Sequence, residues 1–304
     1  MIIAQPLPRC QAWENPRSPD LFARYCERTA RHLGDLIHVA ATFNEPNLGF
    51  LLRWLLPPPL LETQKQMLAA AARATGSQRF SSLQMGDQVK LLPQLLSAHR
   101  KGSAAIKTAA PHAPCGVTLA LVDDQAVGPD SQRDRKRREV NGPWLEAARS
   151  DDFVGVQTYS RNRIDKNGLL PPSKGTETTQ TGDEFYPEAL EATIRYAAQE
   201  TGKPVYVTEN GSATTDDTRR IVYIDRALAG VKRCLADGVD VRSYLHWTLL
   251  DNFEWIFGYG PRFGLVAIDR ETQRRTPKPS ARHLGDIARA AGPERTLAGN
   301  PGSS

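Results

Sequence analysis

Apolar runs alternate with amphipathic segments along most of the chain, and this alternation predicts the fold. Five short runs are apolar and rich in Val, Ile or aromatic residues, as buried strands are: 37–43, 116–122, 153–158, 204–208 and 241–249. Longer segments carry apolar residues at helical spacing: 20–33, 60–74, 87–101, 132–149, 187–200, 216–235 and 279–291. Because parallel strands need crossover connections, strands that alternate with helices predict an α/β fold with a parallel sheet.

The segment 160–186 is the one long stretch without either pattern, and it is rich in Gly, Pro, Thr and Ser. A domain linker would have this composition. Strand–helix units lie on both sides of it, however, which favours a long loop over one face of a single domain. We therefore expect one domain over residues 1–304, with 292–304 as a flexible tail.

Composition is that of a soluble globular protein, with 40% hydrophobic and 24% charged residues. The longest apolar stretch, 48–61, is interrupted by Arg53 and three prolines, and it is shorter than the ~20 residues that span a bilayer. The first ten residues lack the cationic and apolar regions of a signal peptide. We therefore expect a cytoplasmic protein without membrane association.

The net charge is +5, and basic residues are densest in the run 133–139. This run resembles a nucleic-acid-binding patch. Two pairs within the run, Asp134 with Arg138 and Arg135 with Glu139, are spaced four residues apart, as on a solvated helix face with its own ion pairs. No aromatic residue interleaves with the run to stack on bases. The solvated helix is favoured, and no nucleic-acid partner is expected.

The four cysteines are far apart, form no C-x-x-C pair and have no histidine at metal-ligand spacing: Cys10, Cys26, Cys115 and Cys234. This pattern favours free buried thiols in a reducing compartment over zinc or a disulfide framework. We expect neither a metal nor a cofactor.

Chemically active side chains gather where the predicted strands end. The first strand runs into Asn44 and Glu45, the third into Tyr159, the fourth into Glu209, and the fifth into the segment 246–255. The carboxyl ends of the strands form the active-site face of a parallel α/β barrel, so these residues are expected to converge. Two glutamates that face one cleft are the groups that glycoside hydrolysis requires.

Three of these segments resemble motifs of glycoside hydrolase family 1. They are Thr-Phe-Asn-Glu-Pro at 42–46, Thr-Glu-Asn-Gly at 208–211 and Leu-Leu-Asp-Asn-Phe-Glu-Trp at 249–255, in family order and spacing. The similarity runs from about residue 13 to about 291. It implies an incomplete (β/α) TIM barrel with about five parallel strands and outer helices, and a retaining β-glycosidase, in particular a β-glucosidase acting on small β-glucosides or short β-linked oligosaccharides.

By this resemblance Glu45 is the general acid/base and Glu209 the nucleophile. A retaining mechanism needs one protonated and one ionised carboxyl only ~5 Å apart. A negative Glu209 raises the pKa of Glu45, and that repulsion disappears once Glu209 is glycosylated, so Glu45 can then act as a base.

The resemblance also assigns substrate contacts. Asn44 resembles the residue that binds the sugar 2-hydroxyl, and Tyr159 the tyrosine that keeps the nucleophile ionised. The glycone pocket would be completed by four residues: Glu254 and Trp255 at the distal hydroxyls, Trp247 as an aromatic platform, and Phe263 in the lining. Without the motifs, a strand-end cap, a packed aromatic or a loop charge would be the more ordinary interpretation of each.

The chain also departs from the family pattern. Three βα units precede the acid/base strand in the family, whereas only 36 residues precede that strand here, and residues 1–18 resemble a remnant of the third unit. A glutamine, a histidine, a tryptophan and an arginine of the family site come from those units. Gln157 stands where the family usually has asparagine.

Two consequences are expected from these departures. Five strands leave two open sheet edges, which predicts a homo-oligomer that covers them. Without the arginine beside the nucleophile, we expect weak activity with a shifted acidic limb, unless Arg161 or another cation substitutes. The alternative function is a catalytically impaired member of the family that acts as a carbohydrate-binding or interaction protein.

Overall fold

A parallel sheet of five strands forms the centre of the protein. It is seen in a computed structural model that describes residues 12–291. The strands pair in the order β1-β2-β4-β7-β8, and every neighbouring pair is parallel. Their bounds are Ala40–Asn44, Cys115–Ala120, Phe153–Thr158, Val205–Asn210 and Val241–His246. The five predicted strands and their parallel pairing are therefore confirmed, with boundaries shifted by a few residues.

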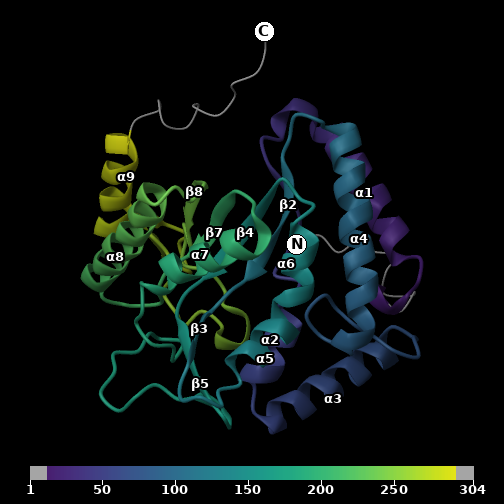
Figure 1. Ribbon diagram of the computed structural model, residues 1–304, viewed down its shortest axis with the longest axis horizontal. Helices are drawn as coiled ribbons and strands as arrows, with labels where there is room; N and C mark the ends of the chain where they lie inside the picture. The colour runs from purple at the N-terminus through teal and green to yellow at the C-terminus, as the bar shows by residue number, and fades with distance from the viewer. Residues whose placement is uncertain (1–11, 292–304) are drawn as a thin grey trace.

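Helices connect successive strands and pack on the sheet (Figure 1). The crossovers contain α4 (Gln88–Ala109), then α5 (Arg133–Val140) and α6 (Gly142–Ala148), then α7 (Ala189–Thr201), and finally α8 (Asp217–Ala236). Figure 1 shows α1 (Ser18–Leu33) beside α4 at one end of the molecule and α9 (Pro279–Ala291) beside α8 at the other. This arrangement confirms the outer helices predicted from the sequence.

The core lies between the central strands and these helices. Every residue of β2 and β4 is buried. Three valines and a leucine of these strands form one cluster with residues of α4, α6, α7 and α8: Val117, Leu119, Val154, Val156, Leu91, Trp144, Leu190 and Tyr223. Each fully buried side chain of this size contributes about 1.5–3 kcal/mol of hydrophobic free energy. The core therefore fixes the positions of the central strand ends.

The two edge strands are much more exposed. On β8 the side chain of Leu245 is 55% exposed, and just before β1 that of Leu36 is 82% exposed. Each edge pairs with one neighbour only, β1 with β2 and β8 with β7. Exposed edges of this kind are the ones that other chains can pair with.

Two expected elements differ in detail. The helix expected over 132–149 is two helices, α5 (Arg133–Val140) and α6 (Gly142–Ala148), because Gly142 and Pro143 interrupt the first and Pro143 fits the start of the second. The apolar stretch near residue 48 forms α2 (Leu48–Leu55), followed by α3 (Pro58–Ala74), which contains the helix expected over 60–74.

The segment 160–186 is not irregular throughout, which corrects the prediction. It contributes β5 (Arg161–Asp165) and β6 (Gly168–Leu170), which with β3 (Asp123–Ala126) form a second sheet in the order β3-β5-β6. The turn between β5 and β6 is closed by the Asp165 carboxylate, which accepts from the backbone N–H groups of Asn167 and Gly168 at 2.7 and 3.1 Å. A further hairpin pairs β9 (Val266–Ile268) with β10 (Arg275–Pro277).

The charged run 133–139 is only partly a solvated face. Arg135 and Glu139 form the expected ion pair at 2.8 Å. Asp134 pairs with Arg133 instead of Arg138. Lys136 is buried and binds both oxygens of the equally buried Asp124 at 2.7 and 2.8 Å, because it points inward from α5 toward β3.

The predictions on cysteines, membrane spans and metal sites can be compared with the structure over the described residues. Cys26, Cys115 and Cys234 are free and buried, as expected, while Cys10 lies outside these residues. So do the tail at 292–304 and most of the remnant proposed for 1–18. Within residues 12–291, no helix is both long and apolar enough to cross a bilayer, and no group of three or more acidic, His or Cys side chains is placed to hold a metal ion.

Candidate active site

The carboxyl ends of β1, β4 and β7 bring the predicted catalytic residues to one site. Gln157 on β4 is in register with Glu209 on β7, and Asn44 at the end of β1 is in register with Thr118 on β2. Glu45 follows Asn44 and is tied to the same neighbour, since its N–H donates to the Thr118 carbonyl at 2.9 Å. The sequence prediction that these strand ends converge is thus realised in the structure.

Glu45 occupies an unusual backbone conformation at the end of its strand. Its φ is 50°, in the left-handed region that residues other than glycine rarely adopt. The bond to Thr118 and a second one, from the Leu48 N–H to the Glu45 carbonyl at 3.0 Å, hold it there. Such conformations cost free energy and are concentrated at functional sites.

Burial, together with the charges of Glu209 and Glu254, raises the pKa of Glu45 to about 8. Desolvation penalises the ionised form, and the two nearby carboxylates repel it. Glu45 is therefore protonated at neutral pH, as a general acid must be.

Two hydrogen-bond donors hold the carboxylate of Glu209. The Tyr159 hydroxyl donates to Oε2 at 2.5 Å, and the Gln157 amide donates to Oε1 at 2.8 Å. The pKa of Glu209 is raised to about 7: burial raises it most, the bond from Tyr159 lowers it, and the charge of Glu254 raises it. No cation in the described chain is among the groups that shift this pKa.

Arg161 does not replace the absent family arginine, which corrects one of the alternatives left open by the sequence. Its guanidinium donates to Glu184 at 2.7 Å and to Gln125 at 3.2 Å, and it lies over the ring of Tyr186 at 4.1 Å. Its charge is thus neutralised within the second sheet, away from the nucleophile.

Glu254 is the third carboxyl of the site. It is partly buried, it accepts a hydrogen bond from the Asn252 amide at 3.0 Å, and its charge raises the pKa of both Glu45 and Glu209. This influence on Glu45 and Glu209 suits the role in binding sugar hydroxyls that the resemblance implies.

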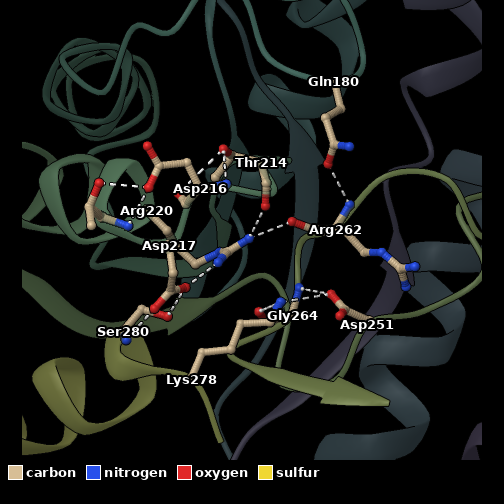
Figure 2. Close-up of polar contacts among 11 residues, drawn as sticks. Gln180, Thr214, Asp216, Asp217, Arg220, Asp251, Arg262, Gly264, Lys278 and Ser280 are labelled. Atoms are coloured by element: carbon tan, nitrogen blue, oxygen red, sulfur yellow. Dashed lines mark hydrogen bonds and ion pairs between the residues drawn. The ribbon is translucent and has the colours of Figure 1, made fainter. Parts of the chain in front are cut away.

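A buried polar network anchors the segment that carries Glu254 (Figure 2). Asp251, 2% exposed, accepts from the Gly264 N–H at 2.9 Å and from Lys278 at 3.1 Å. Arg220 of α8 is fully buried, and it donates to the carbonyl of Arg262 at 2.6 Å and forms an ion pair with Asp217. The network ties the segment after β8 to α8 and to the start of α9.

The other predicted site residues lie at different depths. Phe263 is buried and its ring meets that of Tyr159 edge-on, with centroids 5.8 Å apart. Trp247 is partly buried, and its backbone N–H donates to the Asn210 carbonyl at 2.9 Å. Trp255 is 69% exposed in a short 3₁₀ helix, Trp255–Phe257. Trp255 thus stands at the open rim.

Several residues that shape the site were not assigned a role from the sequence. Gln157 contacts both Asn44 and Glu209. Tyr223 on α8 accepts from the Asn210 amide at 3.1 Å and donates to the Tyr159 carbonyl at 2.8 Å. Tyr223 therefore links the nucleophile strand to the segment that carries Tyr159. The place of Gln157 at a strand end was the only available signal for any of them.

Comparisons with known proteins agree with this geometry. Residues 149–293 match the model of glycosyl hydrolase family 1. The chain is 29% identical to a β-galactosidase of Sulfolobus acidocaldarius, over 92% of this chain and 60% of that protein. It is 28% identical to β-glucosidase A of Acetivibrio thermocellus, over 88% of this chain and 67% of that protein. The chain thus spans about 60% of the length of the first curated relative.

Solved structures are more similar still. The apo structure of a β-glucosidase is 47% identical, with a TM-score of 0.88 over 92% of this chain and 70% of that one. A β-glycosidase crystal structure is 48% identical, with the same TM-score over 98% and 72% of the two chains. These likenesses confirm the partial (β/α) barrel.

A pair of carboxyls at the carboxyl ends of barrel strands is the kind of site found in glycoside hydrolases built on a (β/α) barrel. Within that class, the chain belongs to glycosyl hydrolase family 1.

Proposed function

We propose that the protein is a retaining β-glycosidase, in particular a β-glucosidase, with Glu209 as nucleophile and Glu45 as acid/base. The observation that carries the proposal is the different surroundings of the two carboxyls. The carboxylate of Glu209 receives hydrogen bonds from Tyr159 and Gln157 that stabilise its ionised form, whereas burial and the charges of Glu209 and Glu254 raise the pKa of Glu45. A desolvated carboxyl beside a hydrogen-bonded carboxylate suits an acid and a nucleophile.

The proposed reaction follows from these protonation states. An oxygen of Glu209 attacks the anomeric carbon while Glu45 gives its proton to the glycosidic oxygen, and the bond to the leaving alcohol breaks. The negative charge of Glu209 is lost in the covalent intermediate, so the pKa of Glu45 falls. Glu45 then removes a proton from water, which attacks the anomeric carbon and restores the Glu209 carboxylate with the configuration retained.

Small β-glucosides are the proposed substrates. Two polar side chains support this proposal, because sugars are bound through their hydroxyls: Asn44 at the end of its strand, and Glu254, whose charge raises the pKa of both Glu45 and Glu209. The names of relatives include both β-glucosidase and β-galactosidase. Parallel rates on the two nitrophenyl β-glycosides would distinguish these preferences.

The direct test is release of nitrophenol from a nitrophenyl β-D-glucoside. Wild type should hydrolyse it, while Glu209→Gln should reduce the rate to background and Glu45→Ala should reduce it strongly. A 2-fluoro-glucoside should add its glycosyl mass to Glu209, because a retaining enzyme forms a covalent adduct. If wild type and Glu209→Gln were equally inert, the proposal would be contradicted and the carbohydrate-binding alternative would be left.

We further propose that the protein self-associates through its sheet edges. Apolar side chains are exposed at both edges, Leu36 before β1 and Leu245 on β8, with Leu249 beyond it at 64% exposure. Burial of apolar surface and pairing of free backbone groups would both favour contact with a second copy. Analytical ultracentrifugation should show an oligomer whose dissociation is promoted by Leu245→Lys. A monomer over a wide concentration range would be inconsistent with this.

A further inference from the structure

Among the described residues, Gln157 is the only one whose side chain hydrogen-bonds both Asn44, which precedes the proposed acid/base Glu45, and the proposed nucleophile Glu209. Its Nε2 donates to Asn44 Oδ1 at 2.7 Å and to Glu209 Oε1 at 2.8 Å. The side chain is 3% exposed and lies on β4, between the strand of Asn44 and the strand of Glu209. One amide nitrogen therefore connects three strands of the site.

The orientation of this amide is fixed by chemistry. An ionised carboxylate only accepts hydrogen bonds, so the nitrogen of Gln157, and not its oxygen, must face Glu209. Its second hydrogen then points to Asn44 Oδ1. The Thr118 hydroxyl lies 3.2 Å from the same oxygen and 3.1 Å from the Phe43 carbonyl, and its one hydrogen can serve either acceptor. Because the oxygen of the Asn44 amide accepts from Gln157, its NH₂ group is left for a ligand, and Asn44 is exposed.

The opposite end of Gln157 has no such use. Its Oε1 is buried and lacks a hydrogen-bond partner. A buried acceptor without a partner costs free energy, and such groups are uncommon in folded proteins. A side chain selected for stability alone would satisfy both ends, so the cost indicates that the donor end is the one that matters.

We infer that Gln157 is a positioning residue that directs the Asn44 amide toward the sugar 2-hydroxyl and holds Glu209 in its ionised form. The inference rests on the proposed function and extends it. Gln157 and Tyr159 together supply the two donors of the nucleophile, in a site where no cation shifts its pKa. The contact with Asn44 couples recognition of the 2-hydroxyl to the state of the nucleophile.

The first measurement tests that coupling. Gln157→Met keeps the length of the side chain and removes its donor, and kcat/KM is compared on a nitrophenyl β-D-glucoside and on its 2-deoxy analogue. The variant should lose about tenfold more on the glucoside than on the 2-deoxy substrate, since one hydrogen bond of this kind is at stake. Equal losses on both substrates would mean that Gln157 does not orient Asn44.

The second measurement does not depend on turnover. In protein labelled with ¹³C at the glutamate carboxyl, the signal that disappears in Glu209→Gln identifies the nucleophile, and its titration midpoint is followed by NMR. Gln157→Met should raise this midpoint by about one pH unit, because the ionised form loses a donor. Gln157→Glu, which is isosteric, should raise it further by repulsion.

The matched control is Gln88→Met, because Gln88 is also 3% exposed and its side-chain amide has no hydrogen-bond partner. This variant should leave both the substrate ratio and the midpoint at wild-type values. A Gln157→Met midpoint equal to wild type overturns the inference, whether or not the wild type hydrolyses glycosides. An inert wild type with a raised midpoint in the variant would instead refute the proposed function and retain the role of Gln157 at Glu209.

Discussion

Removing the Tyr159 hydroxyl should raise the pKa of the proposed nucleophile and shift the pH dependence of hydrolysis. The hydroxyl donates to Glu209 Oε2 at 2.5 Å, and this bond opposes the burial that raises the pKa of Glu209, which is about 7 with the bond in place. The phenyl ring that remains in Tyr159→Phe can still pack edge-on against Phe263. The substitution therefore removes one donor with little change in packing.

The size of the effect follows from the bond. A hydrogen bond to a charged group contributes about 1.5–3 kcal/mol, and one pKa unit corresponds to about 1.36 kcal/mol. Loss of the donor destabilises the ionised form only, so the pKa of Glu209 should rise by about one to two units. At about pH 6, each unit of rise in the pKa of Glu209 lowers its ionised fraction tenfold. The kcat/KM of Tyr159→Phe should therefore be ~10–100-fold below that of wild type at this pH.

The assay is kcat/KM for a nitrophenyl β-D-glucoside between about pH 5 and pH 9.5, with nitrophenol read after quenching in base. Tyr159→Phe should move the acidic limb upward from about 7, while Tyr196→Phe, on the outer helix α7, should leave it in place. A uniform loss of activity with an unmoved acidic limb would show that Tyr159 acts through packing alone, and the reasoning would be refuted.

Three further predictions concern pH and stability. The wild-type profile of kcat/KM should be a narrow bell with limbs near 7 and 8, because the active form needs Glu209 ionised and Glu45 protonated, and both limbs belong to the coupled pair. Both folded-state pKa values lie above the ordinary value of 4.5, so the folded protein loses stability as pH rises from there toward 8. Glu209→Gln and Glu45→Gln should therefore raise Tm at about pH 9 and match wild type at about pH 4, whereas an equal gain at both pH values would contradict the sign. Arg220→Met should lower the free energy of unfolding in urea by about 3–5 kcal/mol, since it leaves the partly buried Asp217 without its ion pair; a loss below 1 kcal/mol would count against the network in Figure 2.

The elements that the sequence predicted well are those with a strong apolar pattern. β2 and β4 are buried along their whole length, so their residues read as continuous apolar runs. β5 begins with Arg161, Asn162 and Arg163, which are polar and only partly buried, so it carries no such pattern. The break between α5 and α6 at Gly142–Pro143 was visible in the sequence, yet helical spacing on both sides concealed it.

The proposed catalytic residues are marked by motifs, whereas the contacts around them required coordinates. Glu45 and Glu209 stand in recognisable segments at strand ends. The role of Gln157 depends on two partners far away along the chain, Asn44 and Glu209, and no local pattern encodes that meeting. The commitment of Arg161 to Glu184 likewise depends on the fold of the second sheet.

Asn44 and Glu209 meet at one side chain although their strands are not neighbours in the sheet. Strands β1 and β7 are separated by β2 and β4, and in a flat sheet three spacings of ~4.8 Å would hold their side chains far apart. Here one nitrogen of Gln157 bonds both Asn44 and Glu209, so these two residues can be separated by no more than two hydrogen bonds. Glu45 is next to Asn44, and the charge of Glu209 raises its pKa. The fold of the sheet and its outer helices thus brings the ends of β1 and β7 to one side chain of β4.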